Sequence, residues 1–165
     1  MTVFKKKFYN FILILPLLFF IDRLSKILIL NYFETSLQTY IKITSFLNLV
    51  LVWNSGVGFG LFSFEENFAY NIITFFVLLV IILIFYLSLK TNNIKFYFYL
   101  IIIGGALGNF FDRILYSAVP DFIDFHIGNF HWFVFNIADI FITVGIICLI
   151  IAEIFYNKEN ANEKN

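Results

Sequence analysis

The sequence predicts an all-α membrane protein with four transmembrane helices and a small β-rich extracytoplasmic platform between helices 1 and 2. Hydrophobic residues make up 61% of the 165 residues and charged residues only 13%, whereas soluble domains average about 45–50% apolar and about 25% charged residues. The mean hydropathy of the chain is +0.90. Four apolar segments reach the roughly 20 residues that a spanning helix requires, and a glycine-containing segment rich in β-branched residues separates the first two.

The four apolar segments belong to one predicted membrane domain, residues 1–156. The first segment follows Lys5, Lys6 and Lys7, as the apolar part of a signal peptide would. It continues past Asp22 without a small-residue cleavage site, so we expect an uncleaved first span. The predicted spans are residues 8–30, 68–89, 96–116 and 133–156.

The distribution of lysines predicts the orientation of the spans. Lysines lie before the first span, between the second and third, and after the fourth, at Lys5–Lys7, Lys90, Lys95, Lys158 and Lys164. Positive residues favour the cytoplasmic side, so we expect both termini in the cytoplasm and segments 31–67 and 117–132 outside. The polar residues 157–165 are expected to form a disordered cytoplasmic tail.

The segment between the first two spans is predicted to form the platform, at about residues 31–67. Tyr40–Trp53 is rich in β-branched and aromatic residues, and it is followed by glycines at Gly56, Gly58 and Gly60. Glycines at this spacing disfavour a helix and permit close approach of the backbone. Because the segment is apolar, we expect it to lie at the outer lipid boundary.

Helical rise places the buried carboxylates of the spans near the outer surface. Asp112 is about 25 Å from Lys95, and Asp139 is roughly 21 Å from Glu153, at about 1.5 Å per residue. The hydrocarbon core is about 30 Å thick, so both carboxylates fall in its outer part. Two further carboxylates lie on the connection between these spans, at Asp121 and Asp124.

Each of these charged residues also has a structural interpretation. Asp139 can be a helix N-terminal carboxylate that faces the macrodipole, although an ionisable residue inside a span is by default a functional candidate. The neighbours in the pair Asp112–Arg113 can form an ion pair that closes the third span. Asp22 and Lys26 are spaced i,i+4 and face the same side of the first span, so they can pair with each other or with polar groups of the site.

A metal cluster is a further possibility on the connection after the third span. Asp124, His126 and His131 lie within eight residues of one another, but their spacing matches no compact metal motif. We therefore interpret them as residues of a solvated loop. A metal-dependent hydrolase that uses them together with Asp121 remains a third-ranked alternative.

Two carboxylates at a membrane boundary suggest aspartic peptide hydrolysis. When two such groups are close, they share a proton, so that one acts as a base and the other as an acid. The base activates water and the acid protonates the carbonyl oxygen and then the leaving nitrogen. This chemistry requires no metal and no cofactor, and no serine or cysteine of the chain has a triad signature. The residues alone leave the choice between Asp112 and Asp121 open.

Five motifs occur in the order found in one enzyme family. They are "DRLSK" (Asp22–Lys26), "NSGVGFG" (Asn54–Gly60), "GNFFDR" (Gly108–Arg113), "VPDFIDF" (Val119–Phe125) and "FNIADI" (Phe135–Ile140). With these motifs, the chain resembles bacterial lipoprotein signal peptidase, which is signal peptidase II, along nearly its whole length. The resemblance implies an intramembrane aspartic endopeptidase.

The resemblance assigns roles to particular residues. It places the catalytic pair on Asp121 and Asp139, with no metal. The residues that line the site, bind substrate or support the pair are then Asp22, Lys26, Asn54, Gly56, Asn109, Asp112, Arg113 and Asn136.

The same resemblance implies the substrate and the location. Family substrates are prolipoproteins that carry a diacylglyceryl group on a cysteine, and cleavage occurs just before that cysteine. The cyclic peptide globomycin inhibits the family. We therefore expect a multi-pass monomer in the bacterial cytoplasmic (inner) membrane, in contact with membrane lipids, with its active site at the outer leaflet. Basic residues are few and scattered, so no nucleic-acid partner is expected.

The chain departs from the family pattern at three places. Pro120 stands where valine is usual, Ser117 where glycine is common, and Phe133–Asn136 lacks a frequent proline. Pro120 fixes its own φ and restricts the residue before it, so it can tilt Asp121.

Two other function classes remain as alternatives. A small proton-coupled transporter or channel subunit would use Asp22, Asp112 and Asp139 as a relay. A relay should cross the bilayer, however, whereas these residues gather on one side. A non-catalytic assembly protein would not explain the ordered motifs.

Overall fold

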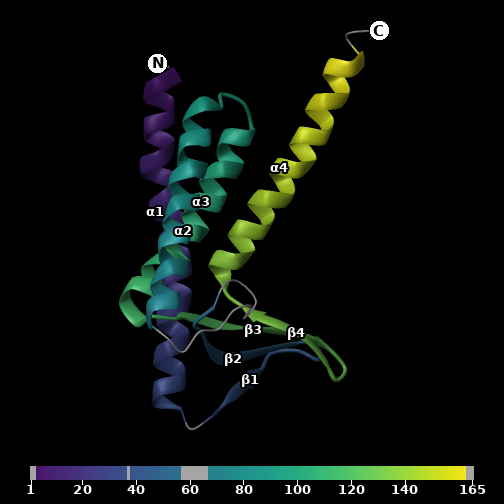
Figure 1. Cartoon of the computed structure of the whole chain (residues 1–165). Helices are drawn as coiled ribbons and strands as arrows, with labels where there is room; N and C mark the ends of the chain where they lie inside the picture. Colours follow the sequence, from purple (N-terminus) through teal and green to yellow (C-terminus); the bar gives the residue numbers. More distant parts are fainter. Residues whose placement is uncertain (1–2, 37, 57–66, 163–165) are drawn as a thin grey trace.

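The computed structural model describes residues 3–36, 38–56 and 67–162, which fold into helices and a small antiparallel sheet (Figure 1). The elements in chain order are α1 (Val3–Thr35), β1 (Tyr40–Lys42), β2 (Leu47–Asn54), α2 (Asn67–Lys90), α3 (Lys95–Tyr116), β3 (Val119–Ile127), β4 (Phe130–Phe135) and α4 (Ile137–Asn162).

Helix α3 is the centre of the helical part, because it packs against α1, α2 and α4. The sheet lies across one end of the helices, and both chain termini lie at the other end (Figure 1). Helix α4 leaves the sheet beside α3 and leans away from the other helices towards its C-terminus. The connection between β4 and α4 is therefore where the sheet meets the helices.

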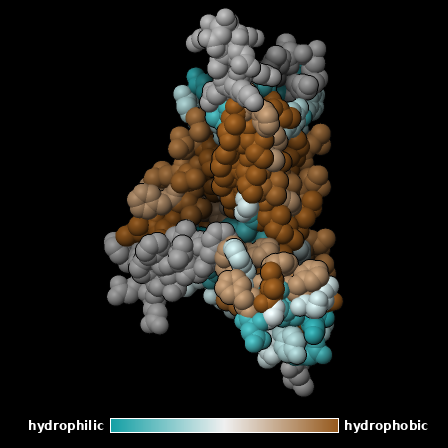
Figure 2. Space-filling view, turned by 90° about the vertical axis from the view of Figure 1, so that its right-hand side faces the viewer, coloured by the Kyte–Doolittle hydropathy of each residue, from teal (hydrophilic) through white to brown (hydrophobic). Residues whose placement is uncertain are grey.

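Three helices in the described part of the chain are long and apolar enough to cross a membrane: Tyr70–Lys90, Lys95–Tyr116 and Ile137–Phe155. A broad hydrophobic band covers the helices, with hydrophilic residues at the two ends of the molecule (Figure 2). Helix α1 contains the predicted first span, residues 8–30, but is not among these three. The fourth transmembrane helix therefore stays a prediction.

Glycines of α3 let the neighbouring helices approach closely. A Cβ atom on Gly104 would lie 2.7 Å from Leu18 Cβ of α1, and one on Gly105 would lie 2.5 Å from the carbonyl oxygen of Ala138 in α4. These separations are shorter than real Cβ contacts, so any larger residue would push the helices apart. The small residues of "GGALG" thus set the spacing of the bundle.

The platform is built from two separate segments, which corrects the expectation that residues 31–67 form it alone. The sheet order is β1-β2-β3-β4, with all neighbours antiparallel. Its second half comes from the connection after α3, which was expected to be a loop. Residues 31–35 belong to α1, and residues 133–135 belong to β4 rather than to the last span. Gly58 and Gly60 lie outside the described residues.

The C-terminal end of the last helix differs from the expectation, whereas the end of α3 agrees with it. Helix α4 extends to Asn162, so residues 157–162 are helical rather than a disordered tail. Helix α3 ends at Tyr116, as expected. Its C-cap residue Ser117 has a φ of 53°, in the left-handed region, and the N–H of Ser117 donates to the carbonyl of Arg113 at 3.1 Å. Glycine adopts this conformation most easily, which gives the physical reason why glycine suits this position.

Candidate active site

Asp121 is a buried carboxylate in β3, 3% exposed, and both of its oxygens accept hydrogen bonds from amides. Asn136 Nδ2 donates to Oδ1 at 2.6 Å, and Asn54 Nδ2 donates to Oδ2 at 2.9 Å. Burial, and secondly the charge of Asp139, raise the pKa of Asp121 to about 6, while the two amide hydrogen bonds oppose this rise. Asp121 is therefore poised to hold or release a proton close to neutral pH.

Asp139 lies in the first turn of α4, where it closes a reciprocal cap with Asn136. The backbone N–H of Asp139 donates to Asn136 Oδ1, and the backbone N–H of Asn136 donates to Asp139 Oδ2, both at 3.1 Å. This is the geometry of a capping box, which satisfies backbone donors at a helix start. The structural interpretation of Asp139 as a helix N-terminal carboxylate therefore holds, and it leaves Oδ1 available to the site.

Asn109 of α3 links Asp139 to a buried lysine. Its Nδ2 donates to Asp139 Oδ1 at 2.8 Å, while its Oδ1 accepts from Lys26 Nζ at 2.9 Å. An ammonium group can only donate, so it fixes the orientation of the amide. Lys26 thereby ensures that Asn109 presents a donor to Asp139.

A buried charge cluster surrounds Lys26 at the interface of α1 and α3. Lys26 Nζ lies 2.8 Å from Asp22 Oδ2 and 2.6 Å from Asp112 Oδ2, and Arg23 also pairs with Asp112. Opposite charges that are buried together require such pairing, because an unpaired buried charge is costly. The alternative of an ion pair between Asp112 and Arg113 is not what the structure shows: consecutive helical residues do not face each other, and Asp112 pairs with Arg23 and Lys26 of α1.

Asp22 connects this cluster to the start of α4. Its Oδ1 accepts from the backbone N–H of Ala138 at 2.9 Å, so a residue of α1 satisfies a free donor in the first turn of α4. A Cβ atom on Gly108 would lie 2.4 Å from Asp22 Oδ2. Glycine at position 108 is therefore required for Asp22 to reach both Lys26 and Ala138.

Arg113 holds the platform against α3. Its Nη2 donates to the carbonyl of Gly56 at 3.0 Å, and its Nη1 donates to the carbonyl of Asn109 at 3.2 Å. The N–H of Gly56 in turn donates to Asn54 Oδ1 at 2.9 Å. This chain of contacts fixes the amide of Asn54 so that its donor faces Asp121.

Tyr70 of α2 is a contact that sequence reasoning missed. Its hydroxyl donates to the carbonyl of Arg113 at 3.3 Å, and the residue is only 6% exposed. The chain has nine tyrosines, and tyrosine is common at both membrane surfaces. No local signal therefore distinguishes Tyr70 from the others.

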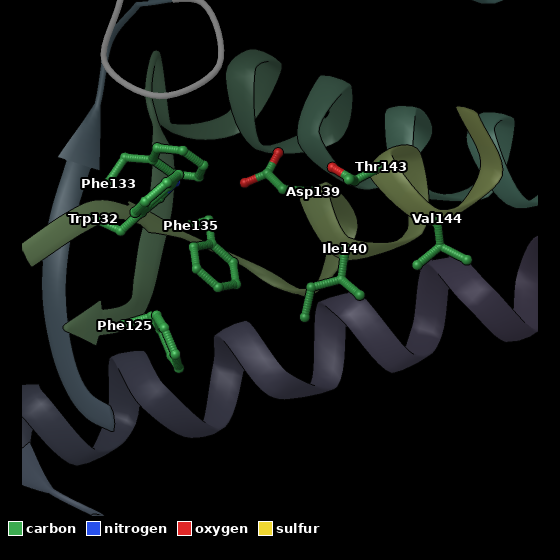
Figure 3. Close-up of a pocket in the computed structure, with 8 residues that line it drawn as sticks. All are labelled: Phe125, Trp132, Phe133, Phe135, Asp139, Ile140, Thr143 and Val144. Carbon is green, nitrogen blue, oxygen red and sulfur yellow. The ribbon is translucent and has the colours of Figure 1, made fainter. Parts of the chain in front are cut away.

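Two cavities meet at Asp139. A cavity of about 230 Å³ is lined by the polar residues Asn54, Asn109, Arg113, Asp121 and Asp139 together with Val77, Ala106, Val119, Ile142 and Thr143. An apolar groove of about 410 Å³ also reaches Asp139, between aromatic residues of the sheet and Ile140 and Val144 of α4 (Figure 3). The two predicted catalytic carboxylates thus line one cavity of mixed polar and apolar residues, which adjoins an apolar groove.

The structure brings together all ten predicted site residues, and it separates Asp124 from them. Asp124 is 4% exposed and His126 is 9% exposed, so the interpretation of this segment as a solvated loop is wrong. Both lie on β3, where Asp124 contacts Asn48 and His131 rather than Asp121 or Asp139.

Comparison with known proteins identifies the family. Residues 14–155 match the family model described as signal peptidase (SPase) II. A lipoprotein signal peptidase of Pelagibacter ubique is 52% identical over 160 residues, which cover 97% of this chain and 96% of that protein. One from Francisella tularensis subsp. novicida is 41% identical over 165 residues, covering 97% and 100%.

Solved structures show the same fold. A bacterial membrane enzyme aligns with a TM-score of 0.71 at 31% identity and covers 92% of this chain and 90% of its own. A second structure of a bacterial membrane enzyme aligns with a TM-score of 0.68 at 31% identity. These likenesses cover 92% and 87% of this chain, and they support neither the transporter nor the assembly-protein alternative. The chain belongs to the signal peptidase II family and is a membrane-embedded peptidase.

Proposed function

We propose that this chain removes the signal peptide from diacylglyceryl-modified prolipoproteins by cleaving just before the lipidated cysteine. The relatives that support this proposal are lipoprotein signal peptidases. The observation that carries it is the pair Asp121 and Asp139, which line one cavity and interact electrostatically. We further infer a single catalytic domain, residues 1–156.

In the proposed reaction the two carboxylates share one proton. The ionised carboxylate takes a proton from water, whose oxygen attacks the carbonyl carbon of the scissile bond, while the protonated carboxyl gives its proton to the carbonyl oxygen. The tetrahedral intermediate then collapses. The C–N bond breaks, and the leaving nitrogen receives a proton from the dyad. No covalent bond to the enzyme forms.

The amides around the dyad hold it ready for this step. Asn54 and Asn136 donate to Asp121, and Asn109 donates to Asp139. Donors to a carboxylate favour its ionised form and fix its orientation. These amides are held in turn by five further residues: Asp22, Lys26, Gly56, Asp112 and Arg113. We assign these five residues positioning roles rather than contact with the reacting atoms.

The apolar groove beside Asp139 fits the lipid part of the substrate. Its lining by Phe125, Trp132, Phe133, Phe135, Ile140 and Val144 suits acyl chains or an apolar signal helix (Figure 3). A substrate of this kind reaches the enzyme laterally through the bilayer. We infer four spans, including residues 8–30, with both termini in the cytoplasm and the dyad at the outer leaflet of the bacterial cytoplasmic membrane. A monomer suffices, because all the site residues come from one chain.

The decisive experiment compares purified wild type, Asp121→Asn and Asp139→Asn on a lipidated prolipoprotein in detergent. We expect wild type to cleave, and either variant to lose about 10²–10⁴-fold in rate, which is what general acid–base catalysis typically contributes. Glu34→Gln, which removes an exposed carboxylate, is the matched control and should cleave normally. Rapid turnover by either dyad variant contradicts the assignment.

Adding EDTA or globomycin to the cleavage assay tests the aspartic peptidase against the metal-dependent alternative. We expect cleavage to persist in EDTA, because the proposed reaction uses no metal, and we expect globomycin to inhibit it. Loss of cleavage in EDTA with recovery on adding metal would favour the metal-dependent hydrolase. If folded wild type fails to cleave, proton flux across proteoliposomes tests the transporter alternative.

A further inference from the structure

Three potential metal ligands converge on the β3–β4 hairpin, outside the dyad. Asp124 and His126 are two residues apart on β3, so their side chains leave the same face of the strand. His131 of β4 is the direct cross-strand partner of His126. The register shifts between Asp124 and His126, and such an irregularity can re-aim a side chain. One carboxylate and two imidazoles are thereby gathered on one face.

The separations of the ligand atoms suit a small divalent ion. His131 Nδ1 lies 2.9 Å and His126 Nδ1 lies 3.9 Å from Asp124 Oδ2, and one ligand atom from each residue lies within 4.8 Å of the others. A tetrahedral zinc ion about 2.1 Å from its ligands holds them about 3.4 Å apart. Changes of up to about 1.4 Å in these separations, from 4.8 Å to about 3.4 Å, are within the reach of side-chain rotation and would complete the site.

A buried atom without a partner points to a ligand here. His126 is 9% exposed, and its Nδ1 has no hydrogen-bond partner among the described residues. Such a buried polar atom is costly and requires an explanation, of which an unseen ion is one. The rings of His126 and His131 stack with their centroids 4.8 Å apart, and the Nδ1 atoms of both lie within 3.9 Å of Asp124 Oδ2.

A supporting contact orients the carboxylate. Asn48 of β2 lies opposite Asp124 in the sheet, and its Nδ2 donates to Asp124 Oδ2 at 3.2 Å. Metal-binding carboxylates are commonly held by such outer hydrogen bonds. Asp121 is not part of this cluster, because both of its oxygens accept from Asn54 and Asn136.

We propose that Asp124, His126 and His131 form a Zn²⁺-binding site that joins β3 to β4. Two imidazoles and a carboxylate are a ligand set that zinc accepts, with water in the fourth position. The site lies on the hairpin that connects the strand of Asp121 to the helix of Asp139. Zinc there stabilises the hairpin and takes no part in peptide cleavage.

The two histidines of the chain are both in this site, which makes the binding test specific. The protein is purified in detergent with an affinity tag that contains no histidine, in a Cys148→Ala background that removes the single thiol. It is stripped with chelator, and Zn²⁺ is titrated against a chromophoric competitor. We expect one equivalent to bind per chain.

His131→Ala is the main variant, because the His131 side chain is 53% exposed and its loss should not prevent folding. We expect at least tenfold weaker Zn²⁺ binding, and loss of the increase in melting temperature that Zn²⁺ gives the parent protein. Asn48→Ala should weaken binding roughly 10-fold or more through the outer hydrogen bond. Glu34→Gln, with an unrelated exposed carboxylate, should bind as the parent does.

Two results would overturn the proposal: no bound Zn²⁺ in the parent protein, or equal binding by His131→Ala. Cobalt substitution provides an independent readout, because the visible spectrum of bound Co²⁺ reports its ligands. We expect this spectrum in the parent and not in His131→Ala. The binding test does not depend on turnover, so its outcome is separate from that of the peptidase proposal.

Discussion

Asn136 is the residue that serves both carboxylates of the proposed dyad. Its Oδ1 accepts from the backbone of Asp139 within the helix cap, and its Nδ2 donates to Asp121. The cap therefore decides which end of the amide faces Asp121, as Lys26 decides which end of Asn109 faces Asp139. At both positions an aspartate in place of the amide would remove the donor and add a repelling charge.

The proton balance of Asp121 leads to a prediction for the pH dependence. Burial and the charge of Asp139 raise its pKa to about 6. Because a charged Asp139 contributes to this rise, the value describes loss of the last proton of the pair. The proposed reaction needs that proton, so kcat/KM of the free enzyme should fall as the pH rises above about 6.

Asn54→Ala tests this directly. The hydrogen bond from Asn54 lowers the pKa of Asp121, so its removal should move the alkaline limb of the kcat/KM profile to higher pH, by on the order of one unit. Asn48→Ala is the matched control, since Asn48 donates to Asp124, and its alkaline limb should stay in place. A limb that moves to lower pH in Asn54→Ala would exclude Asp121 as the group that titrates there.

At the scale of elements, helix packing around α3 depends on glycines, which have no side chain. Gly104 faces Leu18 and Gly108 faces Asp22, both of α1. The two contacts differ in kind, because Leu18 is apolar whereas Asp22 binds Lys26 and the first turn of α4. Overpacking at either glycine costs typically 1–3 kcal/mol, but only overpacking at Gly108 would also disturb the candidate active site.

Gly108→Ala and Gly104→Ala should therefore separate stability from activity. We expect both to lower the free energy of unfolding in detergent, by about 1–3 kcal/mol. Only Gly108→Ala should lower kcat of the folded fraction, because it displaces Asp22 from Lys26 and from the start of α4. Equal loss of kcat in the two variants would show that Asp22 does not position the dyad.

At the end of α3, a substitution to glycine is expected to raise the free energy of unfolding rather than lower it. Ser117 has φ 53° and Gly128 in the β3–β4 turn has φ 60°. A left-handed conformation costs a non-glycine residue roughly 1–2 kcal/mol, and the flexibility of glycine offsets part of this. Ser117→Gly should raise the free energy of unfolding by about 0.5–1 kcal/mol and Gly128→Ser should lower it by a similar amount. Thermal melting in detergent measures both, and shifts of the same sign would contradict this account.

At the scale of the whole molecule, the candidate active site and the two chain termini lie at opposite ends of the helices. The sheet lies at one end of the helices, and both termini lie at the other (Figure 1). Asp121 lies in β3 and Asp139 in the first turn of α4, which follows β4, so the candidate site is at the end of the sheet. The hydrophobic band lies between these ends (Figure 2). This arrangement fits the proposed orientation, in which the sheet faces outward.

Cysteine labelling tests that orientation in cells. In a Cys148→Ala background, we would place single cysteines at the exposed positions Lys5 and Asn129. An impermeant maleimide should label Asn129→Cys in intact spheroplasts and should label Lys5→Cys only after the membrane is permeabilised. Labelling of Lys5→Cys in intact spheroplasts would reverse the topology.

The positions of the helices could be predicted from the sequence, because hydrophobic length is a local property. The spans at 68–89 and 96–116 agree with α2 and α3 within one residue at each end. The i,i+4 pairing of Asp22 with Lys26 could also be predicted, because the helical repeat is a local property too. The choice of Asp121 over Asp112 needed the family resemblance, since both are isolated carboxylates near the outer boundary.

The remaining features depend on contacts between residues far apart in the chain, so only the tertiary structure decided them. The sheet pairs β2 with β3, which are separated by two helices, and no local pattern specifies that partner. The same holds for the pairing of Asp112 with α1 and for the burial of Asp124 and His126. Composition and helical periodicity therefore determined the membrane helices of this protein, whereas long-range packing determined which polar groups meet at its site.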